Sequence, residues 1–288
     1  MAIIVNTNLS SLKTRTNLNN ATNSLNTALE RMSTGLKINR AADDAAGMYI
    51  ATNLSTQISG SKVAQSNVET GNNVLSIVEG NLDVILDNLN RVRDLAVQAA
   101  NGVYGTDART AMAAEVKARS AEITRIAKAA NFNGIELLTA NSTKGITADL
   151  KLQVGANADA DANAITIDKA VFAAITGSGI LDTDTNIETA FNTAAGAATF
   201  ITKVDTAISG INTRKTTIGA AQNRLASAAD SLTTTIENAT AAKSTIMDAD
   251  IAEESAQFTK QQILRQTSAS LLVQANAMPS IALNLIAG

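Results

Sequence analysis

A seven-residue repeat of apolar side chains constrains the fold of this chain more than any other feature. In the first half, apolar or small residues recur at every seventh position, and a second set follows them by three residues. The positions are Val68, Leu75, Leu82, Leu89 and Ala96, with Gly71, Val78, Ile85, Val92 and Ala99. This spacing is that of the a and d positions of a coiled coil. The pattern therefore predicts a long helix with one face covered by a partner helix.

A second repeat of the same spacing lies near the other end of the chain. Its members are Val204, Ile211, Ile218, Leu225, Leu232, Ala239 and Ile246. Carboxylates favour helix starts and an Asn-Gly pair favours a helix end, so we predict that the first long helix begins at Asp43 or Asp44 and ends at Asn101-Gly102. Its counterpart is predicted from about residue 194 to residue 250. Since the two helices have similar lengths, we expect them to pair.

Shorter amphipathic helices are predicted at both ends. Their apolar stripes are formed by Leu18, Leu25 and Met32 near the N-terminus and by Leu264, Leu271 and Met278 near the C-terminus. Gly35 can end the first helix in a left-handed conformation. Short helices with one apolar stripe cannot bury that stripe alone. We therefore expect residues 1–43 and 251–288 to be disordered in the monomer and to become helical between neighbouring copies.

A third helix and a small β region complete the expected fold. The helix begins at Thr106 or Asp107, runs to about residue 130, and is followed by the turn signal Asn133-Gly134. Around Leu150 and Ile165, apolar and polar residues alternate as they do in strands. The predicted fold class is mainly α: an elongated rod of long antiparallel coiled-coil helices, residues 44–139 and 194–250, with a small β-rich insertion, residues 140–193, at the tip.

Composition narrows what such a chain can do. Its 288 residues contain no His and no Cys, which excludes Ser-His-Asp and Cys-His catalysis, the usual zinc sites and every disulfide. Aromatic residues make up only 2% of the chain, too few to anchor a large compact core. A net charge of −3 offers no electrostatic footprint for nucleic acid or an anionic membrane. We expect a structural protein, not an enzyme, with no cofactor, no nucleic-acid partner and no membrane insertion.

Two acidic runs, starting at Asp159 and Asp182, imitate the opening of a calcium-binding EF-hand loop. That loop needs Gly at its sixth position and Glu at its twelfth, but the first run has Ala164 and Ala170 there. The second run fails at the same two positions. We interpret both as acidic surface turns and expect no metal site.

Several stretches resemble the bacterial flagellins, the subunits of flagellar filaments. The most specific is ERMSTGLKIN at residues 30–39, followed by DDAAG at residues 43–47. Further similar stretches are residues 6–8, 89–98, 132–134, 152–157, 221–225, 248–250 and 274–276, the last ahead of Pro279. The resemblance covers roughly residues 1–155 and 200–288.

This resemblance implies a secreted subunit that polymerises into an extracellular filament for swimming motility. The terminal helices would line the inner tube, the long helices would form the wall around it, and the insertion would face outward. It also implies export in unfolded form through the flagellum's own type III channel. The chain has no Cys, so no disulfide would block its passage. Its first apolar run, residues 2–5, is too short for a signal peptide. An export chaperone, the filament cap and hook-junction proteins would be its partners.

The resemblance further implies recognition by innate immune receptors. In the family, the flagellin-sensing Toll-like receptor of animals binds a surface formed by the stretch similar to residues 89–95 and by the Glu that corresponds to Glu115. The candidate residues here are Leu89, Asn90, Arg91, Asp94, Leu95 and Glu115. The alternative is an ordinary subunit contact in which Arg91 pairs with Asp87 or Asp94 and Leu95 covers the edge of the apolar seam. Both can hold, because a surface needed for assembly is one that a bacterium cannot easily change. Asn90 and Asp94 stand where receptor-activating members commonly carry Gln and Glu, and each is one methylene shorter, so we expect recognition to be retained or weakened, not abolished.

Two other functions fit the sequence less well. A hook–filament junction protein resembles flagellin at its ends, but the stretch at residues 89–95 and the close match at both termini favour flagellin. Some flagellins carry a zinc peptidase in the central segment. With no His, and with about 54 residues there, this chain is not expected to be one.

Overall fold

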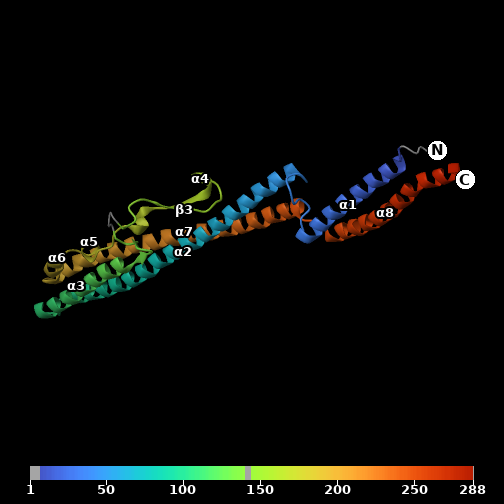
Figure 1. Ribbon diagram of the computed structural model, residues 1–288. Coiled ribbons are helices and arrows are strands. Elements are labelled where there is room, and N and C mark those ends of the chain that lie inside the picture. The colour runs from blue at the N-terminus through green and yellow to red at the C-terminus, as the bar shows by residue number, and fades with distance from the viewer. Residues whose placement is uncertain (1–6, 140–143, 288) are drawn as a thin grey trace. The chain divides into compact units, whose positions relative to one another are not determined.

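The computed structural model describes residues 7–139 and 144–287 (Figure 1). The chain forms two compact units. We call Ile58–Ile236 the central unit, and Met1–Gln57 together with Glu237–Gly288 the terminal unit. Two long helices, α2 (Ala45–Ala100) and α7 (Ala194–Met247), contribute residues to both. The observed bounds of α2 and α7 differ from the predicted bounds of the two long helices by only a few residues.

In the central unit, α2 and α7 run antiparallel. Arg93 Nε lies 2.6 Å from Asp205 Oδ1, and farther along the pair Gln222 Nε2 donates to Glu79 Oε2 over 3.0 Å. From the first contact to the second, the residue number increases along α7 and decreases along α2, so the two helices run in opposite directions. A third helix, α3 (Thr106–Ala129), packs along α2 and is also antiparallel to it. The predicted two-helix pairing is thus a three-helix bundle, because α3 covers the free side of the α2 seam.

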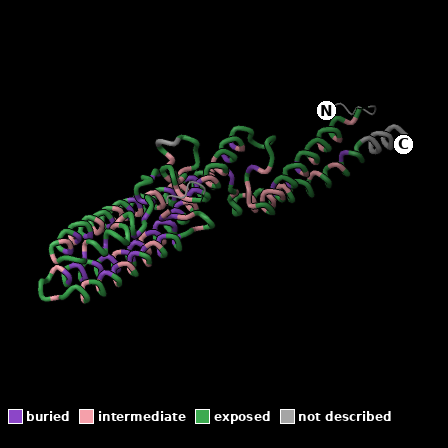
Figure 2. The backbone as a smooth tube through the Cα atoms, turned by 90° about the vertical axis from the view of Figure 1, so that its left-hand side faces the viewer, coloured by how far each residue is buried: buried purple, intermediate pink, exposed green. Residues whose placement is uncertain are grey.

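The apolar repeats of α2 and α7 form the core of this bundle. Figure 2 shows the buried residues concentrated along these helices. From Val68 to Ala99 every residue of both α2 repeats is buried, and so are Val204, Ile211, Ile218, Leu225 and Leu232 of α7. Burial of apolar surface contributes about 25 cal/mol per Å², so this row of side chains is the main stabilising feature of the central unit.

Residues 144–193 combine strands with short helices. Strands β3 (Leu150–Gln153) and β4 (Ala164–Ile167) form the antiparallel pair expected there, with Leu150 opposite Ile167. Between and after them come α4 (Ala160–Asn163), the 3-10 helix Lys169–Phe172, α5 (Gly177–Ile180) and α6 (Asp184–Phe191). The strands were predicted from alternation. The short helices were not, because segments of four to eight residues show no helical period.

The β3–β4 pair lies against the side of α2 (Figure 1). Asn67 Nδ2 donates to the Gln153 carbonyl over 3.2 Å, and a Cβ on Gly71 would overlap the Leu152 side chain. The insertion was expected at the tip of the helical hairpin, and this pair instead folds back along it. The reason is its apolar face, which includes the buried Ile165 and Ile167 and needs a covering surface.

A tight hairpin follows α3. Strands β1 (Asn131–Phe132) and β2 (Ile135–Glu136) are joined by Asn133 and Gly134, whose φ angles are 49° and 81°. Positive φ at both central residues is what a two-residue hairpin turn requires, and Asn-Gly adopts it at low cost. The turn predicted from this dipeptide is therefore confirmed.

In the terminal unit, α1 (Leu9–Thr34) pairs with α8 (Ile251–Ala287). Gly35 ends α1 with φ 72°, as predicted for a left-handed cap. At the start of α2, Asp44 Oδ1 accepts hydrogen bonds from the N–H groups of Ala46 and Gly47, each over 3.0 Å. Of the two predicted helix starts, Asp43 and Asp44, it is therefore Asp44 that caps the helix. Across the described ranges, no helix has the length and apolar character needed to cross a membrane.

Candidate assembly surfaces

Two peptide segments meet where α1 ends and α7 ends. Lys37 N–H donates to the Met247 carbonyl over 2.6 Å, and Ala249 N–H donates to the Gly35 carbonyl over 2.9 Å. Leu36 and Asp248 are thereby opposite each other in an antiparallel bridge. We call residues 35–37 with 247–249 the linker junction. It joins segments that are more than two hundred positions apart in the sequence.

A small apolar cluster covers the linker junction. Ile38, Ala51 and Met247 are buried, and Leu36, Met48 and Ile246 pack around them. Gly47 lies so close that an added Cβ would be 2.7 Å from Ile38 Cδ1, so a larger residue there would displace the cluster. Ile246 is half-buried and forms part of this cluster, not of the central core.

The linker junction and two further contacts set the register between α1 and α8. Near the junction, Arg31 Nη1 lies 3.0 Å from Glu254 Oε1. Near the chain ends, Asn8 Nδ2 donates to the Ala275 carbonyl over 2.6 Å. The helices are thus held antiparallel over most of the length of α1.

In this register, a mostly polar stripe of α8, which we call the polar stripe, faces α1, and the apolar Phe258 and Leu272 are half-buried beside it. Glu254, Gln261 and Ser268 are half-buried and Ala275 is buried, each seven residues from the next. Leu264, Leu271 and Met278, the predicted apolar stripe, are 43%, 48% and 53% exposed. The α1 stripe behaves differently, because Leu25 is buried while Leu18 and Met32 are half-buried.

Large apolar side chains are therefore left uncovered on both terminal helices. They are Leu9, Leu12 and Leu29 of α1 and Ile251, Ile263, Leu264, Leu271, Val273 and Met278 of α8, all at least 43% exposed. We call them the apolar faces of the terminal helices. Single exposed apolar residues are ordinary, but a run of them along a helix indicates an interaction surface. Figure 2 shows how few buried residues the terminal unit has.

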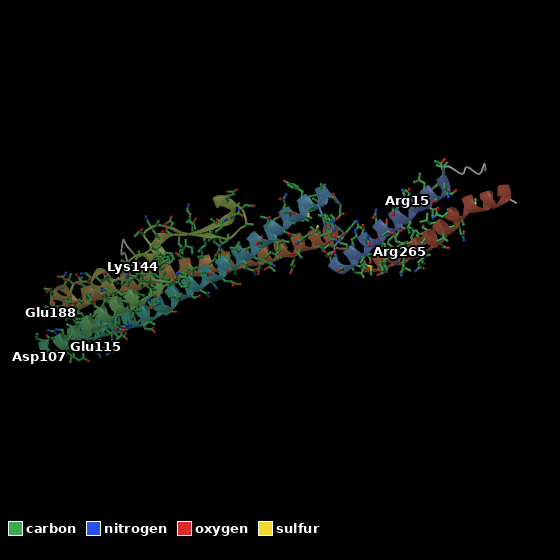
Figure 3. All side chains as sticks on the ribbon, viewed as in Figure 1. Arg15, Asp107, Glu115, Lys144, Glu188 and Arg265 are labelled. Carbon is green, nitrogen blue, oxygen red and sulfur yellow. The ribbon has the colours of Figure 1, made fainter. Side chains whose placement is uncertain are left out.

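A second surface lies on the central unit, where α2 meets α3. Arg91 Nε donates to Glu115 Oε1 over 2.9 Å and its Nη2 donates to Oε2 over 3.3 Å, which makes a bidentate ion pair. Glu115, labelled in Figure 3, lies on α3. The hydrogen bond from Arg91 lowers the pKa of Glu115, and the same bond raises the pKa of Arg91. Arg119 joins this pair, because its Nη2 lies 3.9 Å from Glu115 Oε1, and its Nη1 donates to Asn88 Oδ1 over 3.2 Å.

The six candidate receptor residues divide by exposure. Asn90, Arg91 and Asp94 are exposed and Glu115 is half-exposed, so these four form one surface. Leu89 and Leu95 are 0% and 3% exposed and belong to the core. The ion pair of Arg91 is with Glu115 and not with Asp87 or Asp94 of its own helix, although Asp94 also attracts the guanidinium group. Antiparallel packing brings Glu115 of α3 across to it.

The second acidic run serves a structural role. Asp182 accepts hydrogen bonds from Lys203 and from Asn186 Nδ2, and the bond from Lys203 is the main reason its pKa falls to about 2. In the described part of the chain no three His, Cys, Asp or Glu side chains are grouped to hold a metal ion.

Both ends of the chain match models of a known family. Residues 5–143 match the bacterial flagellin N-terminal helical region, and residues 201–286 match the bacterial flagellin C-terminal helical region. The chain belongs to the bacterial flagellin family. It is therefore a structural filament subunit of the extracellular flagellar filament, and not an enzyme.

Relatives match along the whole chain. The flagellar filament 33 kDa core protein of Treponema phagedenis is 34% identical, with 99% of this chain and 100% of that protein aligned. The flagellin of Bacillus subtilis is 35% identical over 98% of this chain and 99% of its own length. A putative flagellar hook-associated protein from Vibrio parahaemolyticus, of solved structure, has a TM-score of 0.58 at 18% identity, covering 71% of this chain and 99% of that one. This last likeness shows a shared fold.

Sequence reasoning missed two parts of these surfaces. The linker junction has no periodic signal, because it is a single backbone bridge between distant segments. The polar stripe of α8 does have one, since Glu254, Gln261, Ser268 and Ala275 are spaced by seven. Attention to apolar residues alone concealed it.

Proposed function

We propose that subunits polymerise by burying the apolar faces of their terminal helices against second copies of the same helices. The observation that carries this proposal is the orientation of α8, whose polar stripe faces α1 while Leu264, Leu271 and Met278 are exposed. Fully burying one Leu or Met is worth about 1.5–3 kcal/mol, and several such residues per subunit would add up along a filament. Contacts between non-identical surfaces do not close, so they build an open helical polymer.

This proposal includes folding on assembly. In a separate subunit the α1–α8 pair buries few apolar side chains, among them Ala21, Leu25 and Ala28. An isolated helix pair with so little apolar burial is marginal against the conformational entropy of its residues. We expect residues 1–43 and 251–288 to gain most of their helicity when neighbouring copies cover them.

Seeded assembly tests the proposal. Monomer would be mixed with short filament fragments or with ammonium sulfate, and followed by electron microscopy and far-UV circular dichroism. A version lacking residues 1–40 and 255–288 should neither elongate seeds nor gain helicity. Filaments that form without these segments would contradict the proposal.

A matched pair of variants tests the surface itself. Leu271→Asn removes an exposed Leu, whereas Gln274→Asn places the same residue on an exposed position one turn away. Leu271→Asn should raise the critical concentration about tenfold or more, because the lost burial is worth more than 1.4 kcal/mol. Equal critical concentrations for the two variants would show that the apolar face is not an assembly surface.

We also propose that the chain is exported in unfolded form. Before export, an export chaperone would bind the apolar faces of the terminal helices. After export, the cap and hook-junction proteins would bind these faces. Support comes from the absence of Cys, which leaves no cross-link to block a narrow channel, and from the small number of aromatic residues. Fusion of a stably folded domain to the chain should stop its secretion, and a destabilised variant of that domain should restore it.

The second surface supports a further proposal, recognition by the animal flagellin receptor. Asn90, Arg91, Asp94 and Glu115 are accessible together, and the Arg91–Glu115 pair orders them. Arg91→Ala should lower receptor activation by the monomer. The control is Arg93→Ala. It removes an exposed Arg that lies two positions from Arg91 in the sequence and is paired with Asp205. Full activation by Arg91→Ala, or equal loss in both variants, would contradict this placement.

A further inference from the structure

The chain has two Asn-Gly pairs, Asn101-Gly102 and Asn133-Gly134, and the structure holds them differently. Asn133-Gly134 closes the hairpin between β1 and β2, where Phe132 and Ile135 are paired on either side. Asn101-Gly102 lies in the loop between α2 and α3, and Asn101, Gly102 and Val103 are all exposed. Asn133 and Gly134 are therefore enclosed between paired strand residues, whereas no strand pairing flanks Asn101 and Gly102.

The Asn101 side chain is arranged for attack by its own backbone. Its Oδ1 accepts the N–H of Val103 over 3.2 Å, which turns the carboxamide toward the peptide that follows it. The nitrogen of Gly102 is in that peptide, and Gly has no Cβ to hinder its approach to Cγ. Within the described residues no hydrogen bond engages the Gly102 N–H, so the nitrogen is available as a nucleophile.

The Val103 N–H adds an electrostatic element. Attack on Cγ places negative charge on Oδ1, and a donor already aimed at that oxygen stabilises the charge as it develops. Asn101 Oδ1 therefore has its own backbone donor, whereas in the described residues no hydrogen bond reaches Oδ1 of Asn133. Ring closure at Asn133 would also have to occur within a two-residue turn whose ends are held by the β1–β2 pairing.

We propose that Asn101 is a self-deamidation site, at which Gly102, Val103 and water convert the amide to aspartate or isoaspartate. The Gly102 nitrogen loses its proton to water or hydroxide and forms a bond to Asn101 Cγ. The Cγ–Nδ2 bond breaks and ammonia leaves, which gives a cyclic imide. Water then opens the imide at either carbonyl. The overall change consumes one water and releases one ammonia, with no oxidant or other co-reactant.

The product alters the end of α2. A carboxylate at residue 101 lies at the C-terminal, negative end of the helix dipole, where negative charge is unfavourable. Isoaspartate also lengthens the backbone between α2 and α3 by one carbon. A subunit in an extracellular filament remains in contact with water, so the fraction of subunits deamidated at residue 101 would increase with the age of the filament.

The test compares the two sites within one molecule. The full chain would be incubated at mildly alkaline pH, digested with trypsin, and analysed by mass spectrometry at intervals. Cleavage after Arg93 and Arg109 gives a peptide whose single Asn is Asn101. Cleavage after Lys128 and Lys144 gives a peptide with Asn131, Asn133 and Asn141, in which fragmentation assigns the modified residue. Deamidation should be faster at Asn101, with isoaspartate among the products. Equal or faster reaction at Asn133, or no reaction at Asn101, would overturn the proposal.

Variants then separate the two features of the site. Gly102→Ala should slow the reaction, and the fold should tolerate it because Gly102 has open space around it and no positive φ. Val103→Pro removes the donor to Oδ1, and Val103→Ala keeps it. Val103 is 86% exposed, so neither change costs packing. Val103→Pro should slow deamidation about fivefold relative to Val103→Ala. Equal rates would remove the role of the Val103 N–H.

Discussion

Lys37 donates its backbone N–H to the carbonyl of Met247 over 2.6 Å, which joins the segment after α1 to the end of α7. The partner bond, from Ala249 to Gly35, depends on a residue with φ 72°. One of the two bonds of the linker junction therefore uses the carbonyl of a residue in the left-handed conformation. This dependence makes the linker junction testable by single substitutions.

Gly35→Ala should weaken filaments. Any L side chain at φ 72° adds strain of about 1–2 kcal/mol, although the space around Gly35 is open. Because we expect the terminal unit to fold on assembly, the effect should appear as a lower depolymerisation temperature, measured by light scattering on heating. Gly80→Ala, in the exposed middle of α2 with open space around it, is the control and should not lower that temperature. Equal losses would contradict a special role for Gly35.

Gly177→Ala should destabilise the central unit. A Cβ there would overlap the carbonyl oxygen and the hydroxyl of Ser120, so α5 would have to move away from α3. Overpacking of this kind costs about 1–3 kcal/mol. Urea unfolding of the monomer would measure it, with Gly219→Ala in open space on α7 as the control. An unchanged urea midpoint would mean that α5 does not pack on α3 as described.

Asp182 should make the central unit sensitive to acid. Its pKa in the folded chain is about 2, below the ordinary value of 3.8, so its contribution to stability is present above that ordinary value and is lost as pH falls through about 2. Urea midpoints measured from about pH 4 downward should fall less steeply for Asp182→Asn than for the parent chain. Asp230→Asn, at an exposed position on α7, should retain the parent slope.

Glu254→Gln should weaken the register between α1 and α8. Glu254 is paired with Arg31 and its side chain is only 13% exposed, so the variant leaves a partly buried cation without its counter-ion. We expect a higher critical concentration for assembly and a larger effect than Glu253→Gln gives at the neighbouring exposed position. If the two variants assemble alike, the Arg31–Glu254 contact does not set the register.

The sequence predicts those parts of the fold that repeat or that have a local stop signal. The heptads give α2 and α7, Gly35 and Asp44 give helix boundaries, and Asn133-Gly134 gives a hairpin. In each case the determining interactions lie within a few residues or recur many times.

Features that depend on tertiary packing were not predictable in this way. Arg91 has acidic neighbours on its own helix, yet its partner Glu115 is reached only through the antiparallel packing of α3. The rotation of α8 is likewise set by contacts such as Asn8 with Ala275, which no local pattern specifies. The family resemblance assigns Glu115 and Arg91 to one surface, but it does not specify the ion pair between them.

The linker junction also has a consequence for the order of folding. Its two hydrogen bonds join the segment after α1 to residues that follow it by more than two hundred positions, so closing it requires a very long loop. Whichever end of the chain becomes available first has no partner until the other arrives. A fragment that contains only one end cannot close the junction, so the terminal unit can be completed only by a chain that is whole.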